Sequence, residues 1–487
     1  MFSGNLEYKN IRFLFVIIIG VVLGVLTSIQ PIFTLILILS VSFLFFTVRY
    51  TNQAFFLGIL FIVLEGFIAS FFTSELIQNV IGLIPELIFS IVLVLLIIKS
   101  KFSLPSLKIY DYILFIIILW SLLISIIQHS DPYLLAFGFR SFFRLILMYW
   151  IIRIIGFSRK ILLEKLVTLL VILVLFEFGV VLFQIIGKNL IGPSTWNTFG
   201  DNLVMSSSTF GAQGTFNRYD ALGMFFGFSS IILLGFFVFY EHKKLYLFAF
   251  FLSIFGIITS TSRQALVVAV IGALIIFASP LKNSNKGRLL FSGIYIIALL
   301  SLIGYFILPD ELLSGEGRNP FELIGSLFDA STYSTEKNQN FRLYFITQIG
   351  SWLIHNHFWG MGLGTFGATF SFDQFEWLYR SLGLTDNFLN YTADVNWISI
   401  LGQLGVVGVV GFVVFFSLVF FSLFYKGIKK QDGLLIITAA ITITWAISGL
   451  FGPNFEIKSN AMFFWIFLGL SLKNLTYNEG DCEEEKV

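Results

Sequence analysis

Apolar runs separated by short polar stretches repeat along almost the whole chain. A membrane-spanning helix needs roughly 20 consecutive apolar residues to cross about 30 Å of hydrocarbon. The pattern predicts about fourteen such helices, at 12–29, 32–47, 54–72, 80–98, 110–128, 138–156, 161–187, 219–240, 245–260, 264–280, 289–308, 396–425, 433–451 and 460–473. A polar run from Thr259 to Arg263 interrupts the apolar stretch 245–280, so one long re-entrant element is an alternative there.

The short loops carry Lys and Arg on alternate sides. Such residues are enriched in cytoplasmic loops. Lys9 and Arg12 therefore place the N-terminus in the cytoplasm. Every second loop agrees, through Arg49; Lys99, Lys101 and Lys108; Arg153, Arg159 and Lys160; Lys243 and Lys244; Lys282, Lys286 and Arg288; Lys426, Lys429 and Lys430; and Lys473. We expect a multi-pass protein of the bacterial cytoplasmic (inner) membrane, with both termini in the cytoplasm.

Two predicted outer loops are long, at about 188–218 and about 309–394. Loops of such length are usually functional or disordered, and the many aromatic residues of the second argue against disorder. Its rings could stack on sugars or lie at the membrane interface. An amphipathic helix is also predicted, lying on the membrane surface over the mouth of a cavity. Its apolar face would carry Leu343, Ile346, Ile349 and Leu353.

Composition supports a membrane protein, because 57% of the 487 residues are hydrophobic and 12% are charged. A soluble domain cannot bury that much apolar surface. The net charge of +2 is too small to indicate a nucleic-acid partner. The single cysteine, Cys482, excludes a disulfide framework, and the four histidines show no metal-ligand spacing. No metal or other cofactor is predicted.

The predicted outer side is unusual in its arginines: Arg140, Arg144, Arg218, Arg263, Arg318, Arg342 and Arg380. Arginine presents a planar fork that binds phosphate in bidentate fashion. Arg140 and Arg144 lie four residues apart on one helical face, where like charges repel, so they need a shared carboxylate or phosphate. Alternatively, each arginine pairs with a carboxylate, such as Glu65, Glu177 or Asp220, or reaches lipid headgroups. For the whole set, an outward-facing anion such as a lipid-linked pyrophosphate is the natural ligand.

Several motifs together resemble the O-antigen polymerase and O-antigen ligase-like superfamily over about residues 205–425. In chain order they are QGTFNRYDAL at 213–222, TSRQA at 261–265, NFR at 340–342, HNHFWGMGLGTF at 355–366, and DVNWI at 394–398 followed by Gly402, Gly405 and Gly408. Their order and spacing match the superfamily pattern.

The resemblance implies an all-helical polytopic membrane fold of the GT-C type, with a large extracytoplasmic loop that carries amphipathic helices and covers a cavity. It also implies inverting, metal-independent transfer of a glycan from undecaprenyl diphosphate to an acceptor hydroxyl. The implied parts are an N-terminal transmembrane bundle (1–200), a core (201–425) that includes the outer loop 309–395, C-terminal helices (426–475) and an acidic cytoplasmic tail (476–487).

The same resemblance suggests roles for individual residues. Such a transfer needs a base for the acceptor hydroxyl and cations for the leaving diphosphate. We expect Asp394 to be the base, with His357 as its rival. The alternatives are that Asp394 caps the following helix and that His357 packs before a glycine turn. The glycines that follow His357 are expected to allow a sharp turn or close backbone approach. Arginines expected to bind the diphosphate or support it electrostatically are Arg263, Arg342, Arg140, Arg144 and Arg218.

The favoured function is polymerisation of undecaprenyl-diphosphate-linked oligosaccharide repeat units into a surface polysaccharide. The superfamily's ligases commonly carry His where this chain has Val395, whereas Asp394 matches the polymerase variant. Ligase-type transfer to another acceptor is the alternative. A lipid-linked oligosaccharide flippase is less favoured because flippases have short loops, and a cell-wall polymerase of the shape and division type has low weight. Expected partners are the lipid-linked oligosaccharide and membrane lipids, with a chain-length regulator and a flippase as candidates.

Overall fold

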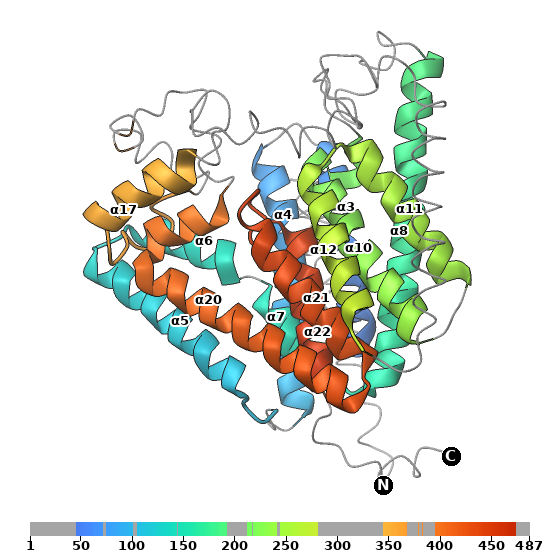
Figure 1. The fold of residues 1–487 in the computed structure, drawn as a ribbon, viewed down its shortest axis with the longest axis horizontal. Helices are drawn as coiled ribbons and strands as arrows, with labels where there is room; N and C mark the ends of the chain where they lie inside the picture. The colour runs from blue at the N-terminus through green and yellow to red at the C-terminus, as the bar shows by residue number, and fades with distance from the viewer. Residues whose placement is uncertain are drawn as a thin grey trace, which may run out of the picture.

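All regular structure in the described part of the chain is helical (Figure 1). The computed structural model describes residues 45–71, 75–100, 105–143, 145–191, 212–216, 218–240, 244–280, 344–367, 378, 382 and 395–473. The predicted all-helical polytopic membrane fold is confirmed.

Among the described residues, six helices are long and apolar enough to cross a membrane, and each overlaps a span predicted from the sequence. They are α3 (Thr51–Ser70), α4 (Glu75–Lys99), α5 (Ile109–Ile127), α8 (Arg159–Ile191), α10 (Tyr219–Phe239) and α20 (Asn396–Lys430). The predicted spans 12–29 and 289–308, and nearly all of 32–47, lie outside the described residues. The total of about fourteen therefore stays a prediction.

The predicted span 138–156 is two helices rather than one. α6 (Pro132–Phe143) and α7 (Ile146–Ile154) meet at a bend of 52°, and the pair would count as a seventh span. α6 begins earlier than predicted because Pro132 suits the first position of a helix and the Asp131 carboxylate accepts a hydrogen bond from the Tyr133 N–H at 2.7 Å.

Four shorter apolar helices complete the bundle: α11 (Lys244–Ser260), α12 (Arg263–Ala278), α21 (Gly433–Ser448) and α22 (Lys458–Leu472). α11 and α12 are separate helices, because Thr261 takes a left-handed φ of 53° between them. α10 is the central helix, because it packs against α8, α11, α12, α21 and α22 and most of its residues are buried.

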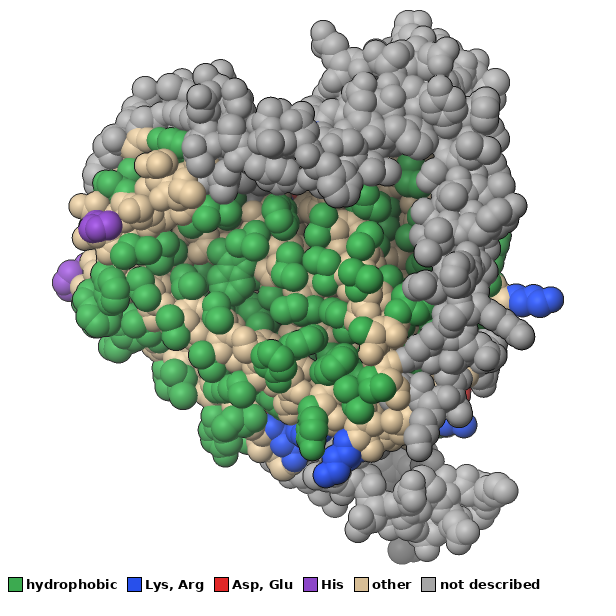
Figure 2. Space-filling model, in the orientation of Figure 1, with side chains coloured by type: hydrophobic (Ala, Val, Ile, Leu, Met, Phe, Trp, Pro, Cys, Tyr) green, Lys and Arg blue, Asp and Glu red, His purple; other side chains and the backbone are tan. Residues whose placement is uncertain are grey.

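Most of the described helices share one core, and a second, smaller cluster joins residues 345–366 and Leu378 to the start of α20. The larger hydrophobic cluster runs from Ala54 in α3 to Leu472 in α22. Helices distant in sequence pack together, with α22 against α7, α20 against α5 and α21 against α12. The outward faces are apolar as well (Figure 2), with Leu119 of α5 65% exposed and Phe421 of α20 66% exposed. Lipid rather than water is the solvent that suits such a surface.

The bundle has two chemically different ends. We call one the lysine end; it holds the Lys99–Thr51 hydrogen bond (2.6 Å) and the Arg159–Asp432 ion pair (2.7 Å). Lys and Arg side chains gather at the lower edge of Figure 2. We call the other the loop end; it holds residues 344–367 and the first residues of α6, α12 and α20. Positions predicted for one side of the membrane thus meet at the same end of the bundle.

Candidate functional site

A glycine-rich loop, residues 358–367, is docked against a break in α20 at the loop end. Gly405 has φ 69° and ψ −169°, which interrupts the helix. The break leaves main-chain groups of α20 without helical partners, and buried groups of this kind must bond elsewhere. The glycine-rich loop supplies the bonds: the Met361 N–H donates to the Gly402 carbonyl and the Gly362 N–H to the Gln403 carbonyl, both at 2.9 Å.

Further bonds complete this pairing. The Val406 N–H donates to the Phe358 carbonyl at 2.9 Å. The Gln403 side chain accepts from the Gly364 N–H and donates to the Phe366 carbonyl, both at 2.6 Å. The Trp120 indole of α5 donates to the Leu404 carbonyl at 2.8 Å. The loop and the helix break are therefore one rigid unit.

The glycines make this docking sterically feasible. Gly360, Gly362 and Gly364 have φ values of 95°, 97° and 78°. A Cβ on Gly360 would lie 2.5 Å from the Gln403 carbonyl oxygen. The prediction of close backbone approach is confirmed, and the approaching backbone is that of the other glycine motif, around Gly405.

The 213–216 segment is held by two buried side chains of α8. Gln184 accepts from the Gly214 N–H and donates to the Gly214 carbonyl, each at 3.0 Å. The Glu177 carboxylate accepts from the Thr215 N–H at 3.1 Å and from the Thr215 hydroxyl. Glu177 was a candidate arginine partner, but its described contacts are with Thr215. The Ala212 N–H donates to the Thr259 carbonyl at 2.9 Å, which ties this segment to the turn before α12.

Two predicted diphosphate-binding arginines lie at the starts of neighbouring helices. Arg263 is the half-buried first residue of α12, after the N-cap Ser262. Ser262 packs against Gly223 of α10, where a Cβ would clash with it. Arg218 precedes α10, is 52% exposed and pairs with Asp220 at 2.7 Å.

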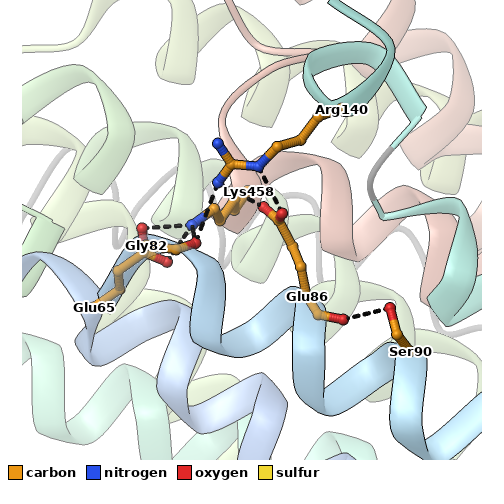
Figure 3. A network of polar contacts seen from close by, with 6 residues as sticks. All are labelled: Glu65, Gly82, Glu86, Ser90, Arg140 and Lys458. Carbon is orange, nitrogen blue, oxygen red and sulfur yellow. Dashed lines mark hydrogen bonds and ion pairs between the residues drawn. The ribbon is translucent and has the colours of Figure 1, made fainter. Parts of the chain in front are cut away.

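Arg140 pairs with a carboxylate that the sequence did not reveal (Figure 3). Its guanidinium binds Glu86 of α4 with both Nε (2.6 Å) and Nη2 (3.1 Å). Beside it, Lys458 of α22 donates to Glu65 of α3 and to the Gly82 carbonyl, each at 2.5 Å. Arg140 also donates to that carbonyl at 3.4 Å. Two ion pairs thus join α3, α4, α6 and α22 around Gly82.

His357 ends a helical segment that packs on α20. A π-helical turn (Phe345–Ile349) runs into α17 (Gly350–Asn356), and their buried face is Phe345, Ile349 and Leu353. The predicted face included Ile349 and Leu353, but Ile346 is only partly buried because a π-turn advances the register. The His357 ring lies against Trp352, with ring centroids 5.2 Å apart. Burial lowers the pKa of His357 below its ordinary 6.5, so the imidazole is neutral at pH 7.

The remaining predicted site residues, Asp394, Arg144 and Arg342, lie outside the described residues. The N-cap of α20 is Val395, the residue that follows Asp394. α6, which carries Arg140, packs directly on the glycine-rich loop through Gly138, whose Cβ would clash with the Gly364 N. In the part of the chain that the structure describes, no three His, Cys, Asp or Glu side chains could together hold a metal ion.

Comparison with known proteins agrees with the motifs. A search of curated proteins finds no match to the chain. Residues 248–413 match the model of the O-antigen ligase family, a region that runs from α11 into α20 and includes both the TSRQA turn and the glycine-rich loop. Residues 248–413 are thus similar to the O-antigen ligase family, which is consistent with a protein of the O-antigen polymerase and ligase-like superfamily.

Proposed function

We propose that this protein is an inverting glycosyltransferase that polymerises undecaprenyl-diphosphate-linked oligosaccharide repeat units at the outer face of the bacterial cytoplasmic membrane. The family match supports glycosyl transfer of the O-antigen polymerase or ligase type. The observation that carries the proposal is the arrangement at the loop end. There the glycine-rich loop packs on the start of α20 and on α6, which carries Arg140. Gln264, which follows Arg263, bonds Asn454. Glu456, in the same loop as Asn454, bonds Asn396 at the start of α20.

The proposed chemistry is a single displacement at the anomeric carbon. A base removes the proton of the acceptor hydroxyl while its oxygen attacks, and the bond from the anomeric carbon to the diphosphate oxygen breaks. The leaving diphosphate carries the negative charge away, so fixed cations near it lower the barrier. We assign Asp394 as the base and Arg263 and Arg342 as diphosphate ligands.

Other predicted residues take supporting parts. His357 is the rival base, and its neutral ring at pH 7 is able to accept a proton. Arg140 shares its charge with Glu86, so we assign it a positioning part beside Arg144. Arg218 is the exposed candidate for donor capture. A flippase that delivers the donor and a chain-length regulator are candidate partners.

Polymerase is preferred to ligase because Asp394 stands where the superfamily's polymerases carry Asp, and Val395 replaces the histidine common in ligases. The test is to supply the purified protein, in lipid nanodiscs, with one lipid-linked repeat unit. A ladder of products supports polymerase, whereas one discrete product on a separate acceptor supports ligase. Transport across proteoliposomes without new glycosidic bonds would overturn both.

The same assay tests the base. We expect Asp394→Asn to lose about 100-fold or more of the rate, since general base catalysis contributes roughly 10²–10⁴-fold. Glu164→Gln, which changes an exposed carboxylate near the start of α8 at the lysine end, is the matched control and should keep full activity. If Asp394→Asn were fully active while His357→Asn was not, the base would be His357.

A further inference from the structure

The loop between α21 and α22, residues 449–457, contacts three helices that carry or adjoin proposed site residues. It lies outside residues 248–413, which match the O-antigen ligase family. Its polar side chains reach α6, α12 and the start of α20. We call it the junction loop.

Glu456 of the junction loop joins α6 to α20. Its carboxylate accepts from the Ser141 hydroxyl at 2.7 Å and from the Asn396 side-chain amide at 3.3 Å. The side-chain oxygen of Asn396 in turn accepts from the Phe455 N–H at 2.9 Å, so the first residue of α20 is held from both sides. Asn396 follows Asp394 by two positions, and Ser141 follows Arg140 directly.

Asn454 of the same loop joins α12. It is fully buried. Its side-chain amide donates to the side-chain oxygen of Gln264 at 3.0 Å and to the main-chain carbonyl of Ser448 at 2.8 Å. Its own side-chain oxygen accepts from Asn460 at 2.9 Å. Gln264 follows Arg263 directly, so Asn454 fixes the helix end that presents the proposed diphosphate ligand.

The two contacts act on different proposed groups. The Glu456 contact fixes a residue two positions after the proposed base, which acts only in the chemical step. The Asn454 contact fixes the residue next to a diphosphate ligand, which already acts when the donor binds. Misplacing a reacting group by about 1 Å can lower a rate roughly 100-fold.

We propose that Glu456 and Asn454 are positioning residues for glycosyl transfer, Glu456 for the chemical step and Asn454 for donor binding. This inference rests on the proposed function. A general scaffold role would affect binding and chemistry alike, whereas the two positioning roles separate them.

The test is steady-state kinetics with the lipid-linked donor, together with thermal unfolding of each variant in the same nanodiscs. Glu456→Gln keeps the shape of the side chain but places an amide where Asn396 and Ser141 donate. We expect kcat to fall roughly 10-fold with the donor KM within about twofold. Gln264→Met removes only the acceptor that Asn454 binds. We expect the donor KM to rise roughly fivefold with kcat within about twofold.

Two further variants guard against misfolding. Ser141→Ala removes one donor to Glu456 without touching the junction loop and should lower kcat in the same direction. Glu456→Asp restores the charge and should recover part of kcat. Glu164→Gln remains the control that changes nothing.

The outcomes separate the inference from the proposed function. Wild-type protein that forms no glycosidic bond refutes the proposed function, and the inference falls with it. Active wild type with Glu456→Gln and Gln264→Met both within twofold overturns the inference alone. Equal changes of kcat and KM in both variants, accompanied by lower Tm, also overturn it, because they indicate a scaffold.

Discussion

Gly360 combines two constraints that only glycine satisfies. Its φ of 95° is unfavourable for a side chain, and its missing Cβ leaves room for the Gln403 carbonyl oxygen and the Gly405 N. Both neighbours are backbone atoms, which cannot move without disturbing the α20 break. The residue is therefore needed for the docking of the glycine-rich loop, whatever the reaction.

We predict that Gly360→Ala lowers the free energy of unfolding by roughly 2 kcal/mol or more, since the strained φ alone costs about 1–3 kcal/mol. Gly179→Ala in α8 is the matched control, because nothing lies within 4 Å of its added Cβ. Alanine in a helix is favoured over glycine by about 0.5–1 kcal/mol, so the control should be neutral or slightly stabilising. Thermal unfolding in nanodiscs compares the two, and equal Tm values would contradict the prediction.

His357 makes stability depend on pH in a direction fixed by its environment. Burial lowers its pKa in the folded protein below the ordinary 6.5, so the unfolded chain binds the proton more tightly. The folded state should therefore lose stability as pH falls below about 6.5. We expect the Tm of the wild type to drop more between pH 7 and pH 5 than that of His357→Gln. An identical drop in both would show that another group is responsible.

The sequence predicted individual site residues but not the partners that the structure shows for them. The surplus of outer arginines indicated an anionic environment for Arg140, and the structure provides Glu86. That partner could not be predicted, because Glu86 is 54 positions away on another helix and no spacing rule joins them. Glu456 was missed for the same reason. Its only sequence signal is a carboxylate in a short polar turn between two apolar spans.

At the scale of elements, hydropathy predicted which segments are helices but not where they break. The span 396–425 reads as one apolar run, yet Gly405 interrupts it. The spacing of Gly402, Gly405 and Gly408 was the available signal, and it matters because the glycine-rich loop pairs there. The bend between α6 and α7 likewise left no mark in the apolar pattern.

The ion pair between Lys458 and Glu65 joins two helices, and its contribution to the free energy of unfolding can be measured directly. The two side chains are 10% and 22% exposed, so an isolated charge there is poorly solvated. Breaking such a pair costs about 3 kcal/mol, whereas replacing both partners by apolar residues is often nearly neutral. We predict that Lys458→Met lowers the free energy of unfolding by about 3 kcal/mol and that Glu65→Leu/Lys458→Met recovers most of the loss.

The control for that pair is Lys430→Met at the exposed end of α20, which should change stability by less than about 0.5 kcal/mol. Unfolding of the wild type, Glu65→Leu, Lys458→Met and the double variant gives the coupling between positions 65 and 458. A double variant less stable than Lys458→Met alone would contradict the prediction.

At the scale of the whole molecule, the two ends of the bundle predict its orientation. The lysine end carries the residues that cytoplasmic loops favour, so the loop end should face outward. The chain's one cysteine, Cys482, makes labelling simple, because Cys482→Ser gives a cysteine-free background. We predict that Ser351→Cys reacts with an impermeant maleimide in spheroplasts, whereas Lys430→Cys reacts only after permeabilisation. The opposite labelling would invert the topology and remove the site from the outer face.

The glycine-rich loop supports α20 at its break, because it bonds the main-chain groups on both sides of Gly405. Movement of the loop away from α20 would break the hydrogen bonds of the Gly402 carbonyl, the Gln403 carbonyl and the Val406 N–H together. A buried main-chain group left unpaired costs roughly 1–3 kcal/mol, so a state in which all three are unpaired is rarely populated. We therefore expect the glycine-rich loop to stay docked on α20 throughout the proposed catalytic cycle. Under the proposed function, we expect the space for the growing glycan to lie on the side of the bundle away from Gly405.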